Sequence, residues 1–236
     1  MAKNKDQGTR FENRVLAALT EMIEKSYGSW GRGIRRREAR GGTQDCDLIV
    51  GTSLGGMVVE CKSKRVDRGV DPACSGAKFY LNQAISPSET TRLVDMAMGF
   101  GFAPVFAFEV IHNGSRGENG REGYLVHGEA VLAHLLEYRG ITLDTLRRTG
   151  SPLAWVKCEG GFGYRTSAGQ VADLLAAYRE AVAGDLEGTA LYEWCIRALD
   201  GRRGRYATPE EVPNIRRMIE RVRNRNNALG WVRGNV

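Results

Sequence analysis

The sequence predicts an α/β protein in which helices flank a mixed central β-sheet. Three observations support this prediction. Apolar residues recur at helical spacing near the start, two apolar strands follow on either side of a glycine-rich turn, and a further apolar run covers 104–111. A helix, a hairpin and a buried strand in this order are typical of a sheet covered by helices.

The composition is that of an ordinary globular chain. Its 236 residues are 42% hydrophobic, which is enough to bury a core, and its 30 glycines indicate many turns rather than a helical bundle. The five cysteines are scattered and form no Cys-x-x-Cys pair, which favours reduced thiols in a cytoplasmic protein. We see no apolar run long enough for a membrane span and no secretory leader, so we expect no membrane partner.

The first expected element is a helix over 8–25. Apolar residues recur at helical spacing from Phe11 onward, and Thr9 is a suitable N-cap. Glu12 would then lie in the first turn, where the helix dipole alone could explain a carboxylate. A glycine- and arginine-rich segment over 27–43 predicts a loop with one short strand.

A β-hairpin follows, with strands over 47–51 and 57–62 and a short turn between them. Both strands are apolar, yet Asp47 lies on the first and Glu60 and Lys62 lie on the second. Burying an unpaired carboxylate is costly, so these charges indicate a site rather than a simple core.

The remaining elements follow from turn and capping patterns. The segment 65–78 is expected to be irregular, and 86–89 has the sequence of a capping box that starts a helix. Beyond the buried strand, the expected elements are a strand over 124–127, a helix over 129–138, strand segments over 154–164, and helices over 168–183, 186–199 and about 215–222.

Positive charge is concentrated in two places. The segment from Arg197 to Val236 contains ten arginines and four acidic residues. Its own net charge of +6 equals that of the whole chain. A second cluster lies between Arg32 and Arg40. Guanidinium groups suit phosphate backbones, although a solvated basic surface would have the same composition.

The hairpin charges have a specific geometry. Side chains alternate along a strand, so Glu60 and Lys62 share a face, and a tight turn would place Asp47 directly opposite Glu60. Like charges at such a pair are destabilising, and a divalent cation is the simplest relief. Oxygen ligands favour Mg²⁺, with the backbone carbonyl of Cys61 as a further ligand and Glu12 within reach from the helix. Lys62 would orient a water or stabilise charge on a phosphate.

Three segments, 8–12, 42–49 and 58–64, resemble the motifs of the PD-(D/E)XK nucleases, and within them the archaeal-type Holliday junction resolvases. The resemblance covers roughly residues 7 to 128. It implies a restriction-endonuclease-like fold and a Mg²⁺-dependent endonuclease in which Mn²⁺ substitutes. It also implies a homodimer that makes two symmetric cuts in a four-way DNA junction.

Residue by residue, Glu12, Asp47, Glu60 and Lys62 match the catalytic positions of that family. Cys46 departs from the pattern, because the family has a proline before the aspartate. The expected DNA contacts, taken from the matching motifs and from the basic clusters, are Arg10, Arg35, Arg36, Arg37, Arg40, Thr43, Lys64, Arg202, Arg203 and Arg205.

The resemblance divides the chain into a nuclease core over 1–130, a continuation or appended α/β segment over 131–184, and a basic, mainly helical extension over 185–236. Two alternatives stay open. One is a nuclease of the same fold with another specificity, such as a RecB-like exonuclease or a restriction-type enzyme. The other is a non-catalytic nucleic-acid-binding protein.

Overall fold

A computed structural model gives the fold. It describes residues 2–27, 34–36, 46–52, 55–80, 84–85, 93, 96–97, 100, 102–114, 120–128, 131, 140–158 and 161–185. The predicted capping box at 86–89, all but one residue of the helix predicted over 129–138, and the whole basic extension after 185 lie outside these residues.

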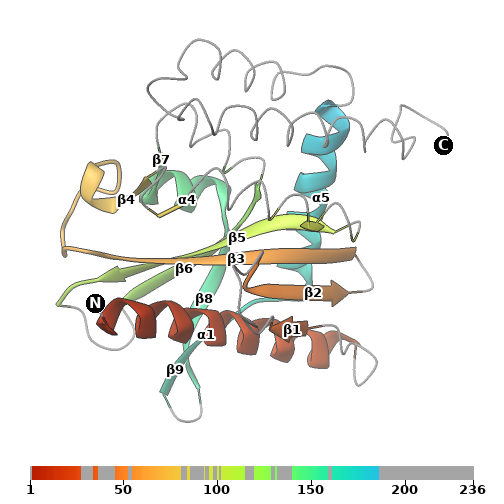
Figure 1. The fold of residues 1–236 in the computed structure, drawn as a ribbon, viewed down its shortest axis with the longest axis horizontal. Helices are drawn as coiled ribbons and strands as arrows, with labels where there is room; N and C mark the ends of the chain where they lie inside the picture. Colours follow the sequence, from red (N-terminus) through yellow and green to blue (C-terminus); the bar gives the residue numbers. More distant parts are fainter. Residues whose placement is uncertain are drawn as a thin grey trace.

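The described chain forms a seven-stranded sheet with the order β1-β2-β3-β5-β6-β8-β9 (Figure 1). Its strands are β1 (Ile34–Arg36), β2 (Leu48–Thr52), β3 (Gly55–Val66), β5 (Ala103–His112), β6 (Arg121–His127), β8 (Ser151–Cys158) and β9 (Gly161–Arg165). β3 and β5 are parallel and every other neighbouring pair is antiparallel. The prediction of a mixed central sheet is confirmed, and the strands expected over 154–164 belong to this same sheet.

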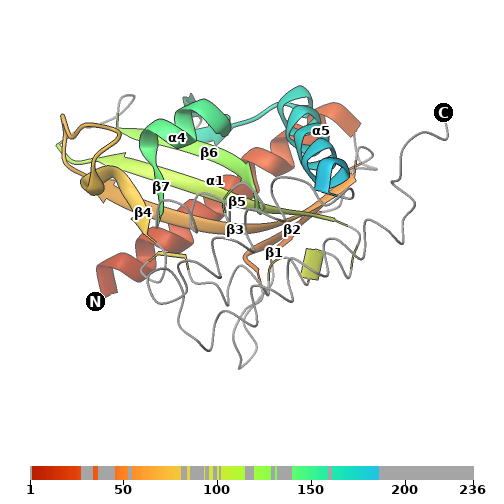
Figure 2. The same cartoon turned by 90° about the horizontal axis from the view of Figure 1, so that it is seen from above.

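Two helices pack on one face of the sheet. The first is α1 (Ala2–Tyr27), which runs beside β3 in Figure 1 and crosses the strands obliquely in Figure 2, and the second is α5 (Ala168–Asp185). The opposite face carries α4 (Leu143–Thr149) and a two-stranded sheet of β4 (Lys78–Tyr80) and β7 (Gly140–Thr142). In the described part of the chain, no helix is both long enough and apolar enough to cross a membrane.

The helix α1 starts earlier than predicted. We expected Thr9 as its N-cap, but Thr9 lies inside the helix, which already includes Ala2. Tertiary contacts hold the additional turns, because Gln7 donates to Ser63 Oγ at 2.9 Å and accepts from Arg65 Nε at 2.7 Å. The expectation that Glu12 lies in the first turn is therefore wrong, and the positive end of the helix dipole does not explain its charge.

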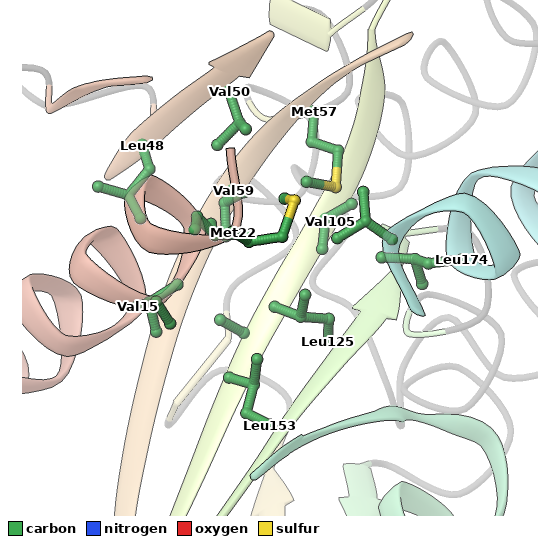
Figure 3. Packing of buried hydrophobic residues seen from close by; sticks show 14 of the residues in the cluster. Val15, Met22, Leu48, Val50, Met57, Val59, Val105, Leu125, Leu153 and Leu174 are labelled. Carbon is green, nitrogen blue, oxygen red and sulfur yellow. The ribbon is translucent and has the colours of Figure 1, made fainter. Parts of the chain in front are cut away.

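The core between α1, α5 and the sheet explains how the hairpin is held in place. Val15 and Met22 of α1 lie against Leu48 and Val59 of the hairpin (Figure 3). Leu174 of α5 completes this cluster from the other end. Each fully buried side chain of this size contributes about 1.5–3 kcal/mol, so the backbone of β2 and β3 is firmly anchored to α1.

Several short elements were not predicted. The strands β4 and β7 have three residues each, and α4 has seven. Elements this short show fewer than two full repeats of a periodic pattern, too few to be recognised, so they depend on contacts made by the fold. The end of β3 was also missed, because the strand continues four residues past Lys62 to Val66, paired along its length with β5.

Candidate metal and phosphate site

The hairpin of β2 and β3 opens at Asp47, one residue before β2 begins. The backbone N–H of Asp47 still donates to the carbonyl of Val59, at 3.1 Å. Its side chain then takes over the pairing, because Asp47 Oδ2 accepts the backbone N–H of Cys61 at 2.7 Å. The Asp47 carboxylate thus accepts an N–H of β3 that a backbone carbonyl would accept if β2 began earlier.

Asp47 lies near Glu60, just beyond the paired part of the hairpin. The paired register runs from Thr52 and Gly55 to Leu48 and Val59, which confirms the predicted tight turn. The N–H of Asp47 bonds to the carbonyl of the same Val59, so the regular pairing ends before Asp47. The Glu60 carboxylate is nevertheless close enough to raise the pKa of Asp47. That the two carboxylates bind one ion stays a prediction.

Lys62 is held by Glu60. Its Nζ donates to Glu60 Oε1 at 2.9 Å, and both side chains are only 15% exposed. The two residues lie two positions apart on β3 and therefore share a face, as predicted. An ammonium group fixed at the edge of a carboxylate pair can contact a phosphate oxygen or a water held nearby.

The carboxylates of Asp47, Glu60 and Glu12 lie close enough to one another to disfavour the ionised form of Asp47. Burial and the neighbouring Glu60 carboxylate raise the pKa of Asp47 from 3.8 to about 7, even though the N–H of Cys61 lowers it. Burial and the same carboxylates raise the pKa of the Cys61 thiol well above its ordinary value, so this thiol stays neutral. A bound cation would reverse the penalty on Asp47.

Glu12 approaches from α1. It lies in the middle of the helix, and its charge contributes to the raised pKa of both Asp47 and Cys61. Val15 packs into the core, while Glu12 is partly exposed at the flank of the helix. Glu12 thus lies within electrostatic reach of Asp47 and Cys61, and its sharing of one metal site with Glu60 and Lys62 stays a prediction.

The donor set fits a hard cation that keeps part of its water shell. Among the described residues, no three His, Cys, Asp or Glu side chains form a ready set of metal ligands. Mg²⁺ does not require such a set, because one or two carboxylates and several waters normally hold it. Asp47 and Glu60 supply two carboxylates. The carbonyl of Cys61 points in about the same direction as its N–H, toward Asp47, because both groups of a strand residue face the same neighbour.

Comparisons with known proteins find similarity to solved structures. The solved structure of Hjc from Archaeoglobus fulgidus, described as a Holliday junction resolvase from an archaeal hyperthermophile, is similar to this chain at 18% sequence identity and a TM-score of 0.38. The similarity covers 60% of this chain and 93% of that one. No family model matches the chain, and no curated protein matches it. A likeness of this size carries no functional conclusion.

The predicted DNA contacts fall in different places. Arg10 is exposed on α1. Lys64 shares the face of Lys62, where its Nζ donates to the carbonyl of Lys78 and lies 5.2 Å from the centre of the Tyr80 ring. Arg35 and Arg36 belong to β1, and their side chains are outside the described set. Also outside the described residues are Arg37, Arg40, Thr43, Arg202, Arg203 and Arg205.

Sequence reasoning missed one charged residue. Glu109 lies within the apolar run of β5 and has no exposed surface. It accepts hydrogen bonds from Ser63 at 2.6 Å, Arg121 at 2.7 Å and Tyr164 at 3.2 Å. A lone glutamate among buried residues was a visible signal, because such a charge requires partners.

Proposed function

We propose that this protein is a Mg²⁺-dependent DNA endonuclease that acts on branched DNA, and that a four-way Holliday junction is its substrate. The observation that supports the proposal is the open end of the hairpin. There Asp47, held by the N–H of Cys61, lies near Glu60, and Glu60 accepts a hydrogen bond from Lys62. The sequence motifs around these residues, and not the weak structural likeness, favour a resolvase-like substrate.

Each residue has a separate role in this proposal. Asp47 and Glu60 hold the cation, with the carbonyl of Cys61 beside them, and Glu12 assists from α1. When bound there, Mg²⁺ would supply an activated water and neutralise charge on the phosphodiester. Lys62 positions the attacking water and stabilises the negative charge that builds on the phosphate oxygens. The partner is DNA, and a homodimer would place two such sites on the two strands to be cut.

Cleavage of a panel of synthetic DNAs tests the proposal. The panel contains a four-way junction, a linear duplex, a flap and a single strand, each with Mg²⁺, with Mn²⁺ and with EDTA. We expect metal-dependent cleavage of the junction, and loss of cleavage in Asp47→Asn and Lys62→Ala. Lys25→Ala is the control, because Lys25 forms an exposed ion pair with Glu21 on the last turns of α1.

The outcomes separate the alternatives. No cleavage of any DNA, or full activity in both site variants, would refute the nuclease. Preference for free ends would select a RecB-like exonuclease, and dependence on duplex sequence or methylation would select a restriction-type enzyme. Binding that is unaffected by EDTA, without cleavage, would indicate a non-catalytic DNA-binding protein. A mass of about twice 26.0 kDa in light scattering would support the homodimer.

A further inference from the structure

The carboxylate of Glu109 lies between two arginines. Arg121 Nη1 is 2.7 Å from Glu109 Oε1, and Arg14 Nη1 of α1 is 3.6 Å from the same oxygen. One buried negative charge therefore faces two positive charges. Burial and the neighbouring Arg121 lower the pKa of Arg14 even though Glu109 acts in the opposite direction. An anion beside Arg14 would relieve this excess of positive charge.

Both arginines also contact one aromatic ring. The guanidinium carbons of Arg14 and Arg121 each lie 5.4 Å from the centre of the Trp155 ring. The two side chains stay partly exposed, at 26% and 22%. The packing on Trp155 therefore helps to hold both guanidinium groups in place while each side chain keeps part of its surface exposed.

The hairpin of β8 and β9 extends this cluster beyond α1 (Figure 1). The rings of Trp155 and Phe162 are stacked, with centroids 5.8 Å apart and an interplanar angle of 16°. The exposed Lys157 is paired across the hairpin with Phe162. Arg10 lies on α1 one turn before Arg14 and is exposed. Partly exposed stacked aromatics among cations are the features with which proteins hold nucleic-acid strands.

We propose that these residues form a second DNA contact, in which the arginines and Lys157 hold backbone phosphates and Phe162 stacks on a base or sugar. We call this region the α1–β9 surface, and its residues are Arg10, Arg14, Arg121, Trp155, Lys157 and Phe162. The proposal rests on the proposed function only in taking DNA as the ligand.

The α1–β9 surface lies on the face of the sheet that α1 covers. Trp155 packs against the same core cluster as Val15 and Val59, whereas Glu60 and Lys62 share the opposite face with Val58. A DNA contact at this surface is therefore separate from the candidate site, and variants there can be tested without changing the site residues.

Binding measured in EDTA tests this surface separately from cleavage. The probe is a fluorescently labelled four-way junction, with a duplex of the same sequence beside it, titrated with the full chain over a range of salt concentrations. In the double variant Arg10→Gln/Lys157→Gln we expect Kd to rise roughly tenfold. The slope of log K against log salt should become shallower by about 1.8, or about 0.9 for each phosphate that the variant no longer neutralises.

Two controls make the result specific. Arg68→Gln/Arg148→Gln also removes two exposed cations, from a turn and from α4, and should change affinity much less. Phe162→Ser should weaken binding about tenfold while Phe162→Tyr retains it, because stacking requires a ring. Unfolding curves check that each variant folds.

Three outcomes would overturn the α1–β9 surface as a DNA contact. They are equal losses of affinity in both double variants, unchanged binding in Phe162→Ser, and absence of DNA binding by the wild-type chain at low salt. If the protein still cleaves DNA when one of these outcomes is found, the proposed nuclease activity is unaffected. If the variants bind more weakly as expected but the protein cleaves no DNA, the α1–β9 surface is supported and only the nuclease activity is refuted.

Discussion

The backbone N–H of Cys61 donates a hydrogen bond of 2.7 Å to the carboxylate of Asp47, across the opening of the hairpin. This bond fixes the Asp47 side chain beside Glu60 at the cost of crowding two carboxylates. The folded chain tolerates that crowding because α1 and the sheet anchor both strands. The site is thus held in a form that favours a cation.

Replacing Asp47 by Asn should stabilise the metal-free protein. The amide oxygen can still accept the N–H of Cys61, while the charge near Glu60 is removed. In EDTA at pH 8 we expect a gain in unfolding free energy on the order of 1–2 kcal/mol, because a buried charge of raised pKa no longer has to ionise. Thermal unfolding with and without Mg²⁺ measures it. A wild-type chain that Mg²⁺ does not stabilise, or a variant that Mg²⁺ stabilises equally, would contradict the assignment of Asp47 as a ligand.

Replacing Lys62 by Ala should separate metal binding from catalysis. Loss of the ammonium frees Glu60 Oε1 from a hydrogen bond, so the stabilisation by Mg²⁺ should be kept or increased. The single-turnover cleavage rate of the junction should fall by about 100-fold or more, because charge on the phosphate is no longer stabilised. If Mg²⁺ stabilisation and cleavage disappear together, Lys62 has a structural role instead.

Glu122 gives a prediction for acid stability. Burial alone would raise its pKa, but hydrogen bonds from Arg147, Tyr124 and His112 outweigh it and lower the pKa from 4.5 to about 2. The folded state then binds fewer protons than the unfolded state between these values. The contribution of Glu122 is therefore fully present above about pH 4.5 and is lost as the pH falls through about 2.

Urea unfolding of wild type and Glu122→Gln measures this contribution. At pH 7 the variant should be less stable by about 1–2 kcal/mol, a value reduced for partial solvent exposure. The difference between the two proteins should shrink steadily below pH 4.5. A difference that is constant from pH 7 to pH 3 would show that the carboxylate charge is not the cause.

Removing the charge of Glu109 should destabilise the fold strongly. Glu109→Gln leaves Arg14 and Arg121 without a buried counter-charge, and breaking such a pair costs about 3 kcal/mol or more. Chemical denaturation at pH 7 measures the change. Glu21→Gln is the control, because Glu21 pairs with Lys25 and Arg165 at the surface and its loss should leave stability nearly unchanged. Similar effects of the two substitutions would contradict a central role for Glu109.

Gly123 leaves room for the ring of Tyr164, whose hydroxyl donates a hydrogen bond to Glu109. A Cβ atom at position 123 would lie 2.7 Å from Tyr164 Cε1 and 3.1 Å from Leu153 Cβ. Gly123→Ala should therefore displace the Tyr164 ring and cost about 2 kcal/mol in thermal or urea unfolding. Gly169→Ala is the matched control in α5, where the nearest atom is 3.8 Å away, and it should stabilise the protein slightly. Equal effects would show that the ring adapts.

Local patterns predicted much of this fold. The period of two along 57–62 predicted that Glu60 and Lys62 share a face, and the short turn predicted the register of β2 and β3 as far as Leu48 and Val59. Both follow from strand geometry, which depends only on neighbours in sequence. The start of α1 was predicted wrongly, because Gln7 extends the helix through contacts with Ser63 and Arg65, which are more than 50 residues away.

The sequence by itself determined the alternation of charge on the hairpin, the helix that carries Glu12 and the apolar strands that hold both in place. Only the tertiary structure decided where the helix begins, that β8 and β9 join the same sheet, and that Glu109 lies between Arg14 and Arg121. The reason is physical. Periodicity is set within a few residues of chain, whereas the partners of a buried charge come from strands and helices that meet only when the chain has folded.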